Sequence, residues 1–210
     1  MKVRYLLFGC LLSFSVSAST DPALPFMDAN SFTPYWIEGA SRVASQPATV
    51  TPFQFQNQLG EAVTDSQMRG HISLVNFFFT SCGSVCPRLM SQVQKVQKKL
   101  ASVPQARFYS FSVTPKRDTP ERLSFYAKSR KLDLKNWDLI TGDHDAIFSL
   151  GRGIFRADRN PDGTKSESGF IHSLAIYLVD SQLRIRGIYQ SGKPEDMKLL
   201  VADVAKLVKE

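Results

Sequence analysis

The pattern of hydrophobic and polar positions after residue 50 alternates between the two-residue period of strands and the longer period of helices. Residues 72–79 form a nearly continuous apolar run, which predicts a central strand buried on both faces. The pattern predicts further strands at residues 53–59, 107–113, 137–140, 173–179 and 183–189. The last two flank a tight polar turn, so we expect them to form a hairpin.

Helices are predicted between these strands, because apolar residues there recur every three or four positions. Residues 87–100 place leucines and valines on one face and lysines on the other, and residues 119–131 begin with the helix-starting sequence Thr-Pro-Glu. The remaining predicted helices are 144–152 and 194–208. This order predicts an α/β protein with a three-layer, thioredoxin-like fold with inserts, in which helices cover both faces of a mixed central sheet.

The first 18 residues have the pattern of a secretory signal peptide. Basic residues precede an apolar stretch of 12 residues, and Val-Ser-Ala at positions 16–18 matches a signal peptidase site. The stretch is short for a bilayer span, so we expect cleavage and export to a bacterial periplasm rather than an N-terminal anchor. We expect residues 19–50 to be an arm or linker and residues 51–210 the folded domain. Within the arm, the apolar residues 32–37 are expected to pack on the domain, with a docking patch as the alternative.

Composition and charge exclude several classes of protein. A chain of 210 residues that is 43% hydrophobic and 21% charged is an ordinary globular protein, not a disordered, collagen-like or disulfide-dense one. Removing residues 1–18 lowers the formal net charge from +7 to +5. This mild basicity suits an acidic partner surface or an anionic membrane nearby. Nucleic acid is not indicated, because no dense basic cluster with interleaved aromatic residues is present.

Two cysteines remain once Cys10 has left with the signal peptide, and their positions favour thiolate chemistry. Cys82 follows the predicted central strand, and Cys86 stands at the start of the next helix. Ligands of open α/β sheets gather at this edge, and a helix N-terminus stabilises a thiolate. Outside the cytosol, such a pair is a disulfide, a redox couple or a metal site.

The spacing of the two cysteines narrows these alternatives. Three residues separate them, which leaves room for an ion between the sulfurs. Two thiolates are soft ligands that suit Cu(I), Zn(II) or an iron–sulfur cluster. Zinc and clusters take four ligands, whereas copper accepts two or three, so the pair fits copper best.

A histidine would complete a three-coordinate copper site, and the chain has three. His71 precedes the central strand at the end opposite Cys82, and His144 is expected to cap a short helix or to face solvent. His172 opens the strand whose entrance faces the cysteines in a thioredoxin-like sheet. A lone histidine is more often structural, so geometry alone leaves both a ligand and a structural role open for His172.

The sequence Phe-Phe-Phe-Thr-Ser-Cys ending at Cys82, followed by Val-Cys-Pro around Cys86, resembles the signature of the Sco/SenC family of copper proteins. Residues 111–121, residues 137–142 and the strand opened by His172 are similar to that family in the same order. The resemblance covers about residues 52–208. It implies a thioredoxin-like fold and copper, as Cu(I) or Cu(II), bound by Cys82, Cys86 and His172. It also implies a role in assembling the dinuclear copper site of cytochrome c oxidase, with the copper-site subunit or another copper-receiving protein as partner.

The sequence departs from the family at two places near the expected site. Thr114 stands where many members have an aspartate, and Phe-Ile precedes His172 where many members have an acidic residue. Fewer carboxylates weigh against tight Cu(II) binding more than against Cu(I) binding, which depends on the sulfurs. Asp118 remains, and two interpretations of it are open: it orients a loop or faces the site, or it is a carboxylate at a helix start.

We therefore expect an exported copper metallochaperone, in which the polar loop 157–169 delivers or withdraws His172. The alternative is an enzyme, a thiol–disulfide oxidoreductase that reduces the cysteines of a copper-receiving partner, with Cys82 and Cys86 as redox pair and Cys82 as the attacking thiol. A third interpretation is an inert disulfide. It is less favoured, because a bond that closes so short a loop constrains the unfolded chain little.

Overall fold

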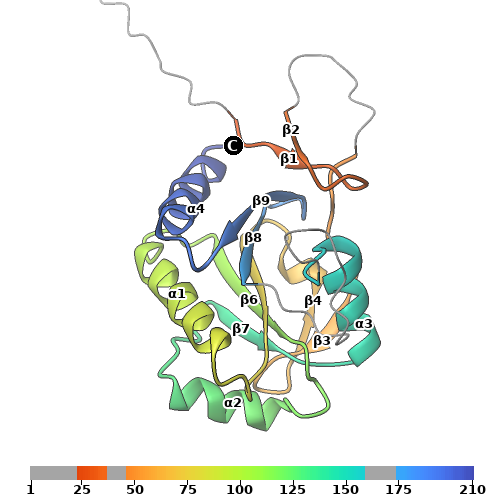
Figure 1. Ribbon diagram of the computed structural model, residues 1–210, viewed down its shortest axis with the longest axis vertical. Coiled ribbons are helices and arrows are strands. Elements are labelled where there is room, and N and C mark those ends of the chain that lie inside the picture. The colour runs from red at the N-terminus through yellow and green to blue at the C-terminus, as the bar shows by residue number, and fades with distance from the viewer. Residues whose placement is uncertain (1–22, 37–45, 159–173) are drawn as a thin grey trace, which may run out of the picture.

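A five-stranded mixed sheet with the strand order β7-β6-β5-β8-β9 forms the centre of the computed structural model (Figure 1). The structure describes residues 23–36, 46–158 and 174–210. Strands β5, β6 and β7 are parallel, whereas β8 is antiparallel to β5 and β9 to β8, so the predicted mixed sheet and its hairpin are confirmed. The strands are β5 (Ile72–Phe78), β6 (Ala106–Ser112), β7 (Trp137–Ile140), β8 (Ala175–Val179) and β9 (Ile185–Gln190).

Two hydrophobic cores lie on opposite faces of this sheet. Every residue of β5 is buried, and its side chains alternate. Leu74 and Phe78 join the core beneath helices α1, α2 and α4, whereas Val75 and Phe77 join the core beneath α3. This two-sided burial is why the strand reads as a continuous apolar run. The helices are α1 (Val85–Lys99), α2 (Pro120–Ser129), α3 (His144–Ser149) and α4 (Pro194–Leu207).

The helices that flank the cysteines begin close to their predicted positions. Thr119 caps α2, because its side-chain oxygen accepts a hydrogen bond from the backbone N–H of Arg122 at 3.3 Å. Helix α1 begins at Val85 rather than at Pro87. A proline is tolerated in a first helical turn, whose N–H groups have no intrahelical acceptor, so it does not mark the boundary. Cys86 consequently lies inside the first turn of α1.

Two other elements differ from the sequence-based expectation. The strand expected at residues 53–59 is shorter, β3 (Gln54–Gln56), and pairs with β4 (Ala62–Thr64), which the pattern missed. Gly60, with φ of +76°, lies in the turn between them, a conformation that favours glycine. The helix expected at residues 144–152 changes after Ser149 into a π-helical turn, Leu150–Ile154.

The segment expected to be an arm contributes buried side chains to the domain. It forms a short hairpin of β1 (Phe26–Met27) and β2 (Pro34–Tyr35) beside the C-terminal end of the chain (Figure 1). Of the apolar residues 32–37, Phe32 packs against the second core, Trp36 is 50% exposed, and Ile37 lies outside the described residues. Among the described residues of the expected arm, the buried apolar side chains are Leu24, Met27, Ala48 and Val50.

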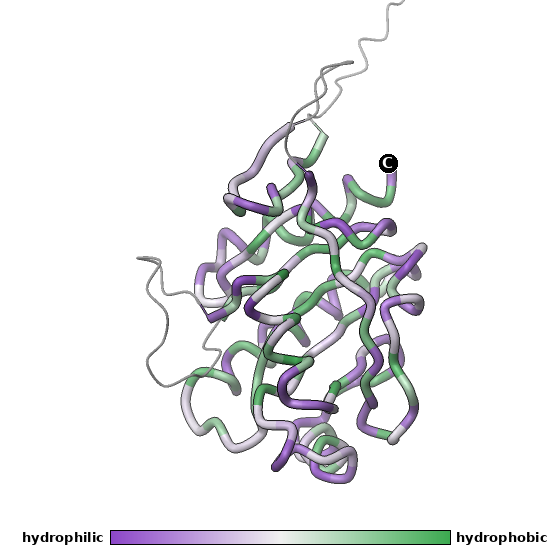
Figure 2. Tube along the Cα trace, turned by 90° about the vertical axis from the view of Figure 1, so that its right-hand side faces the viewer, coloured by the Kyte–Doolittle hydropathy of each residue, from purple (hydrophilic) through white to green (hydrophobic). Residues whose placement is uncertain are grey.

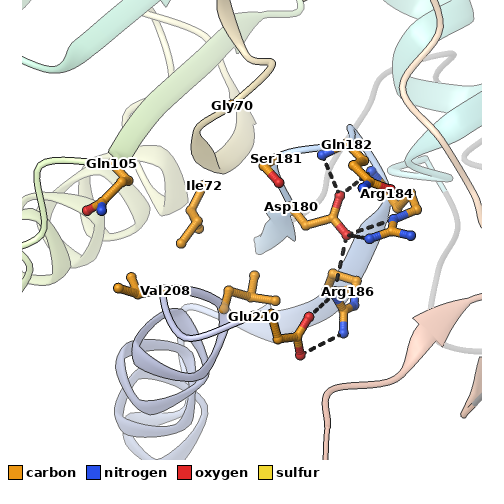
Figure 3. A pocket seen from close by; sticks show the side chains of 11 residues that line it. Gly70, Ile72, Gln105, Asp180, Ser181, Gln182, Arg184, Arg186, Val208 and Glu210 are labelled. Atoms are coloured by element: carbon orange, nitrogen blue, oxygen red, sulfur yellow. Dashed lines mark hydrogen bonds and ion pairs between the residues drawn. The ribbon is translucent and has the colours of Figure 1, made fainter.

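A buried arginine, Arg186, joins this arm to both the sheet and the C-terminus. Figure 3 shows its ion pairs with Asp180 and Glu210. The guanidinium of Arg186, in a residue that is 2% exposed, donates hydrogen bonds to the carbonyl oxygens of Leu24 at 2.8 Å and Pro25 at 2.9 Å. It also forms ion pairs with Glu210 at 2.6 Å and with Asp180 at 3.3 Å. Removing one of these partners would leave a buried charge poorly compensated. The bonds of Arg186 therefore hold the arm against the sheet and the C-terminus.

Hydropathy along the trace follows the two cores (Figure 2). Hydrophobic stretches run through the sheet and the inner faces of the helices, and hydrophilic stretches lie at the periphery. Within the described ranges, no helix has both the length and the apolar character that a membrane crossing requires. The predicted signal peptide, residues 1–18, lies outside the described residues.

Candidate metal and thiol site

The two cysteines meet where β5 ends and α1 begins. The backbone N–H of Cys82 donates to the carbonyl oxygen of Phe79 at 3.3 Å, which closes a turn after the strand. The backbone N–H of Cys86 donates to the sulfur of Cys82 at 3.2 Å. Both thiols are free, and the two residues are recessed, with exposed fractions of 8% and 5%. The three-residue spacing thus brings both thiols to one helix N-terminus.

The two thiols differ in acidity because they are hydrogen-bonded differently. Burial acts to raise the pKa of Cys82, but hydrogen bonds from the Cys86 thiol and from the backbone N–H groups of residues 84–86 outweigh it, so the pKa is lowered. Burial, together with its hydrogen bond to Cys82, raises the pKa of Cys86 to about 12. Cys82 is therefore the more acidic thiol of the pair and loses its proton before Cys86.

Asp118 holds the loop that carries Cys82 against the end of β6. Its carboxylate accepts hydrogen bonds from the backbone N–H of Thr80 at 3.0 Å and the Thr80 hydroxyl at 2.5 Å. It also accepts bonds from the hydroxyls of Ser112 at 2.6 Å and Thr114 at 3.0 Å. The residue is 1% exposed. Of the interpretations open for Asp118, the structure has the one in which it orients a loop, and Thr119 is the helix cap.

Tyr126 is a residue near the site that the sequence reasoning missed. Its ring packs 5.6 Å from that of Phe78, and its buried hydroxyl has no hydrogen-bond partner among the described residues. Burial raises its pKa to about 12; Arg130 opposes this, and the electrostatic influence of Cys86, Cys82 and Asp118 adds to the rise. The helical pattern predicts only that this tyrosine is part of the hydrophobic core. The sequence gives no indication that its hydroxyl lies near the cysteines.

The structure separates two of the histidines from the cysteines. His71 precedes β5, at the opposite end of that strand from Cys82. His144 begins α3, where its ring stacks 4.1 Å from that of Phe148 and its Nδ1 lies 2.8 Å from a carboxylate oxygen of Asp145. Neither contributes to the cysteine site, in agreement with expectation.

His172, the expected third ligand, lies outside the described residues, as does most of the loop 157–169. The register of β8 still defines the end of the sheet at which that strand starts. Tyr177 pairs with Val75 and Val179 with Ser73, so the first residue of β8 lies at the carboxyl end of β5. Across residues 23–36, 46–158 and 174–210, no group of three or more His, Cys, Asp or Glu side chains is placed to hold a metal ion.

Comparisons with known proteins identify the family. The sequence profile of the SCO1/SenC family matches residues 41–209. A SCO1 protein homolog of Bacillus subtilis is 33% identical over 158 residues, which cover 74% of this chain and 80% of that protein.

Solved structures agree with this assignment. BsSco, described as a member of the Sco family of cytochrome c oxidase assembly proteins with a disulfide switch, has a TM-score of 0.67 and 30% identity over 78% of this chain and 96% of its own. The structure of Bradyrhizobium japonicum ScoI with copper bound has a TM-score of 0.56 and 28% identity over 76% of this chain and 99% of its own. The fold is thioredoxin-like, and the chain belongs to the SCO1/SenC family.

Proposed function

We propose that the protein is an exported copper metallochaperone that binds one copper ion through Cys82, Cys86 and His172. It delivers this ion during assembly of the dinuclear copper site of cytochrome c oxidase. The observation that carries the proposal is the meeting of two recessed thiols, one with a lowered pKa, at the first turn of α1. Copper bound to a Sco relative supports the choice of metal.

The donor set of the described residues fits Cu(I). Two thiolates are soft ligands, and with Cu(I) they form a site of net charge −1, which the N-terminus of α1 stabilises. The hydroxyl of Thr114, at the position where a carboxylate would favour Cu(II), donates to Asp118 instead. We therefore propose Cu(I) as the form held most tightly.

Each residue of the site has a distinct role in this proposal. Cys82 supplies the first thiolate, and Cys86 loses its proton when the ion binds. His172 closes the site from the loop that precedes β8, and withdrawing it weakens the hold on copper for release. Asp118 keeps the cysteine loop in place through Thr80.

An anaerobic Cu(I) titration of residues 19–210 in competition with a chromophoric chelator tests the proposal. We expect one tightly bound equivalent, which is lost in Cys82→Ser/Cys86→Ser. His172→Ala should weaken the affinity and leave the circular dichroism spectrum unchanged. The matched control is His144→Ala, since this histidine is paired with Asp145 away from the cysteines. Binding no tighter than that of the double serine variant would remove the chaperone function.

The proposed location is the bacterial periplasm, and it rests on the signal pattern of residues 1–18. The proposed partner is the copper-site subunit of cytochrome c oxidase, supported by the description of BsSco as a member of a family of cytochrome c oxidase assembly proteins. Fractionation of cells that express the chain with a C-terminal tag tests the location. The expected product is a periplasmic protein with residue 19 at its N-terminus.

A second function, thiol–disulfide exchange, is favoured by the unequal acidity of the two cysteines. The Cys82 thiolate would attack a disulfide of the copper-receiving protein and form a mixed disulfide, with one partner thiolate leaving. The Cys86 thiol would then lose its proton, attack Cys82 and release the second partner thiolate. The partner gains two electrons, and the pair ends as a disulfide. The reduction potential of the Cys82–Cys86 pair, measured against a glutathione buffer, decides whether this transfer is downhill.

A further inference from the structure

The recessed position of the cysteines determines how a partner must approach them. With exposed fractions of 8% for Cys82 and 5% for Cys86, neither sulfur stands above its surroundings. Transfer of an ion or of a disulfide needs direct contact with these sulfurs. A specific protein interface covers about 800 Å² on each partner, far more than two thiols. The partner must therefore cover the surface around the cysteines, and the chemistry of that surface identifies it.

That surface carries a set of exposed cations, here called the basic rim: Arg88, Lys116, Arg117 and Arg122. Arg88 lies in the first turn of α1, and the others lie in the loop between β6 and α2 and at the start of α2. In the part of the chain that the structure describes, none of the four forms an ion pair with a carboxylate. Their charge is thus free to act on a partner.

One hydrogen bond and the chain connection to Asp118 place the basic rim beside the cysteine loop. The Nε of Arg122 lies 3.4 Å from the hydroxyl oxygen of Thr80, two residues before Cys82. Lys116 and Arg117 directly precede Asp118, whose carboxylate binds the same threonine. Figure 1 shows α2 lying across the end of the molecule at which α1 begins. The cations therefore lie beside the site rather than elsewhere on the protein.

Few negative charges oppose the basic rim. Residues 79–90 contain no acidic residue, and residues 113–125 contain two, Asp118 and Glu121. The first is buried and saturated with hydrogen bonds, so Glu121 is the exposed carboxylate of these two segments. The exposed groups of both segments together carry a net charge of +3.

Large apolar side chains lie next to the basic rim and remain in contact with solvent. Phe125, one turn after Arg122 on α2, is 65% exposed, and Leu59 in the β3–β4 turn is 66% exposed. Both line one groove between α2 and that turn, whose charged lining residues are Glu121 and Lys128. Val85, the neighbour of Cys86, is 38% exposed. Exposed aromatic and aliphatic anchors beside unpaired arginines are typical of protein interfaces rather than of a solvated face.

We propose that the basic rim, with Phe125 and Leu59, is the surface on which the copper-receiving protein docks, and that the docking face of that protein is acidic with an apolar centre. The inference rests on the proposed function for the reason to dock, since the receiving protein must reach Cys82 and Cys86. Opposite charges would steer the two sites together and set their orientation, and the apolar anchors would hold the encounter complex.

Charge reversal tests the proposal. The rim variant is Arg88→Glu/Arg117→Glu, and the matched control is Lys95→Glu/Lys99→Glu, which changes the charge equally on the outer face of α1, where both lysines are exposed. The probe is the purified soluble domain of the copper-site subunit of cytochrome c oxidase from the same organism. Its binding to the reduced, copper-free protein is measured by NMR titration at ionic strengths of about 20 and 300 mM, which span the range in which salt screens surface charge.

We expect the wild-type affinity to fall at least about tenfold at high salt, and the rim variant to lose a similar factor at low salt, while the control stays within twofold of wild type. Affinity that does not depend on salt, or equal losses in both variants, would overturn the proposal. Vesicles containing phosphatidylglycerol form a second arm. If the basic rim binds these vesicles and not the copper-site domain, the surface is a membrane contact and the proposal of a protein partner is wrong.

Copper binding is measured separately in the same variants. Because docking is followed in the copper-free protein, loss of Cu(I) binding in the wild type would refute the proposed function and leave the docking result intact. Conversely, tight Cu(I) binding without salt-sensitive docking would refute only the docking surface.

Discussion

The buried carboxylate of Asp118 provides a sharp test of how the cysteine loop is held. Asp118→Asn keeps the shape of the side chain and removes its charge together with one acceptor oxygen. A hydrogen bond to a charged group stabilises by about 1.5–3 kcal/mol, against about 0.5–1.5 kcal/mol for a neutral one. Four such bonds reach this carboxylate, from Thr80 twice, Ser112 and Thr114. Each bond should weaken by about 1–1.5 kcal/mol, so the free energy of unfolding should fall by about 4–6 kcal/mol.

Urea denaturation of the reduced, copper-free protein measures this loss. Ser112→Ala, which removes one donor and leaves the carboxylate with three, should cost about 1 kcal/mol. Glu121→Gln, in the first turn of α2, is the control for removing a carboxylate near the site, and because this carboxyl is exposed the loss of stability should be much smaller than that of Asp118→Asn. A loss below about 1 kcal/mol in Asp118→Asn would refute the reasoning. So would an unchanged pH profile of Cys82 alkylation, since the backbone donors to Cys82 belong to the loop that Asp118 fixes.

Three further predictions follow from individual side chains. Iodoacetamide at neutral pH should label Cys82 before Cys86, because the pKa of the first thiol is lowered and that of the second is raised; equal labelling by mass spectrometry would contradict this. Tyr126→Phe should change stability at pH 7 by less than about 1 kcal/mol, because the lost hydroxyl has no partner among the described residues. Its raised pKa means that the native state resists ionisation, so stability declines above about pH 10, and this decline should be shallower in the variant. Gly142→Ala should cost about 1–3 kcal/mol in urea, because a Cβ there would lie 2.7 Å from the ring of Phe55.

Elements long enough to repeat a hydrophobic pattern were predictable from the sequence, and very short elements were not. The apolar run of β5 and the helical spacing of α1 both result from burial against large neighbours, so they leave a pattern along the chain. Strand β4 has three residues and a single buried side chain, Val63, which is too little for a period to register. The start of α1 was placed two residues late, because a proline in a first turn looks like a boundary.

In the candidate site, too, some residues were predictable from local sequence and others depend on long-range contacts. The two cysteines were found because their spacing and their place after a strand are local. The role of Asp118 depends on its contact with Thr80, 38 residues away. The hydroxyl of Tyr126 lacks a hydrogen-bond partner among the described residues because of the side chains that the fold places around it. No local sequence pattern indicates the role of Asp118 or the environment of Tyr126. Only the folded structure reveals such contacts.

Arg186 and its hydrogen-bond partners, here called the Arg186 clamp, lie at the end of the domain opposite the cysteine site. Asp180 follows β8, and β8 runs antiparallel to β5, so the clamp lies at the end of the sheet remote from Cys82 and Cys86. Residues 24 and 25 are bound there beside Glu210. The described chain therefore begins, at residue 23, at one end of the domain, and the two recessed thiols lie at the opposite end. If the protein is held from its N-terminal side, the cysteine site lies at the end of the domain that points away from the attachment.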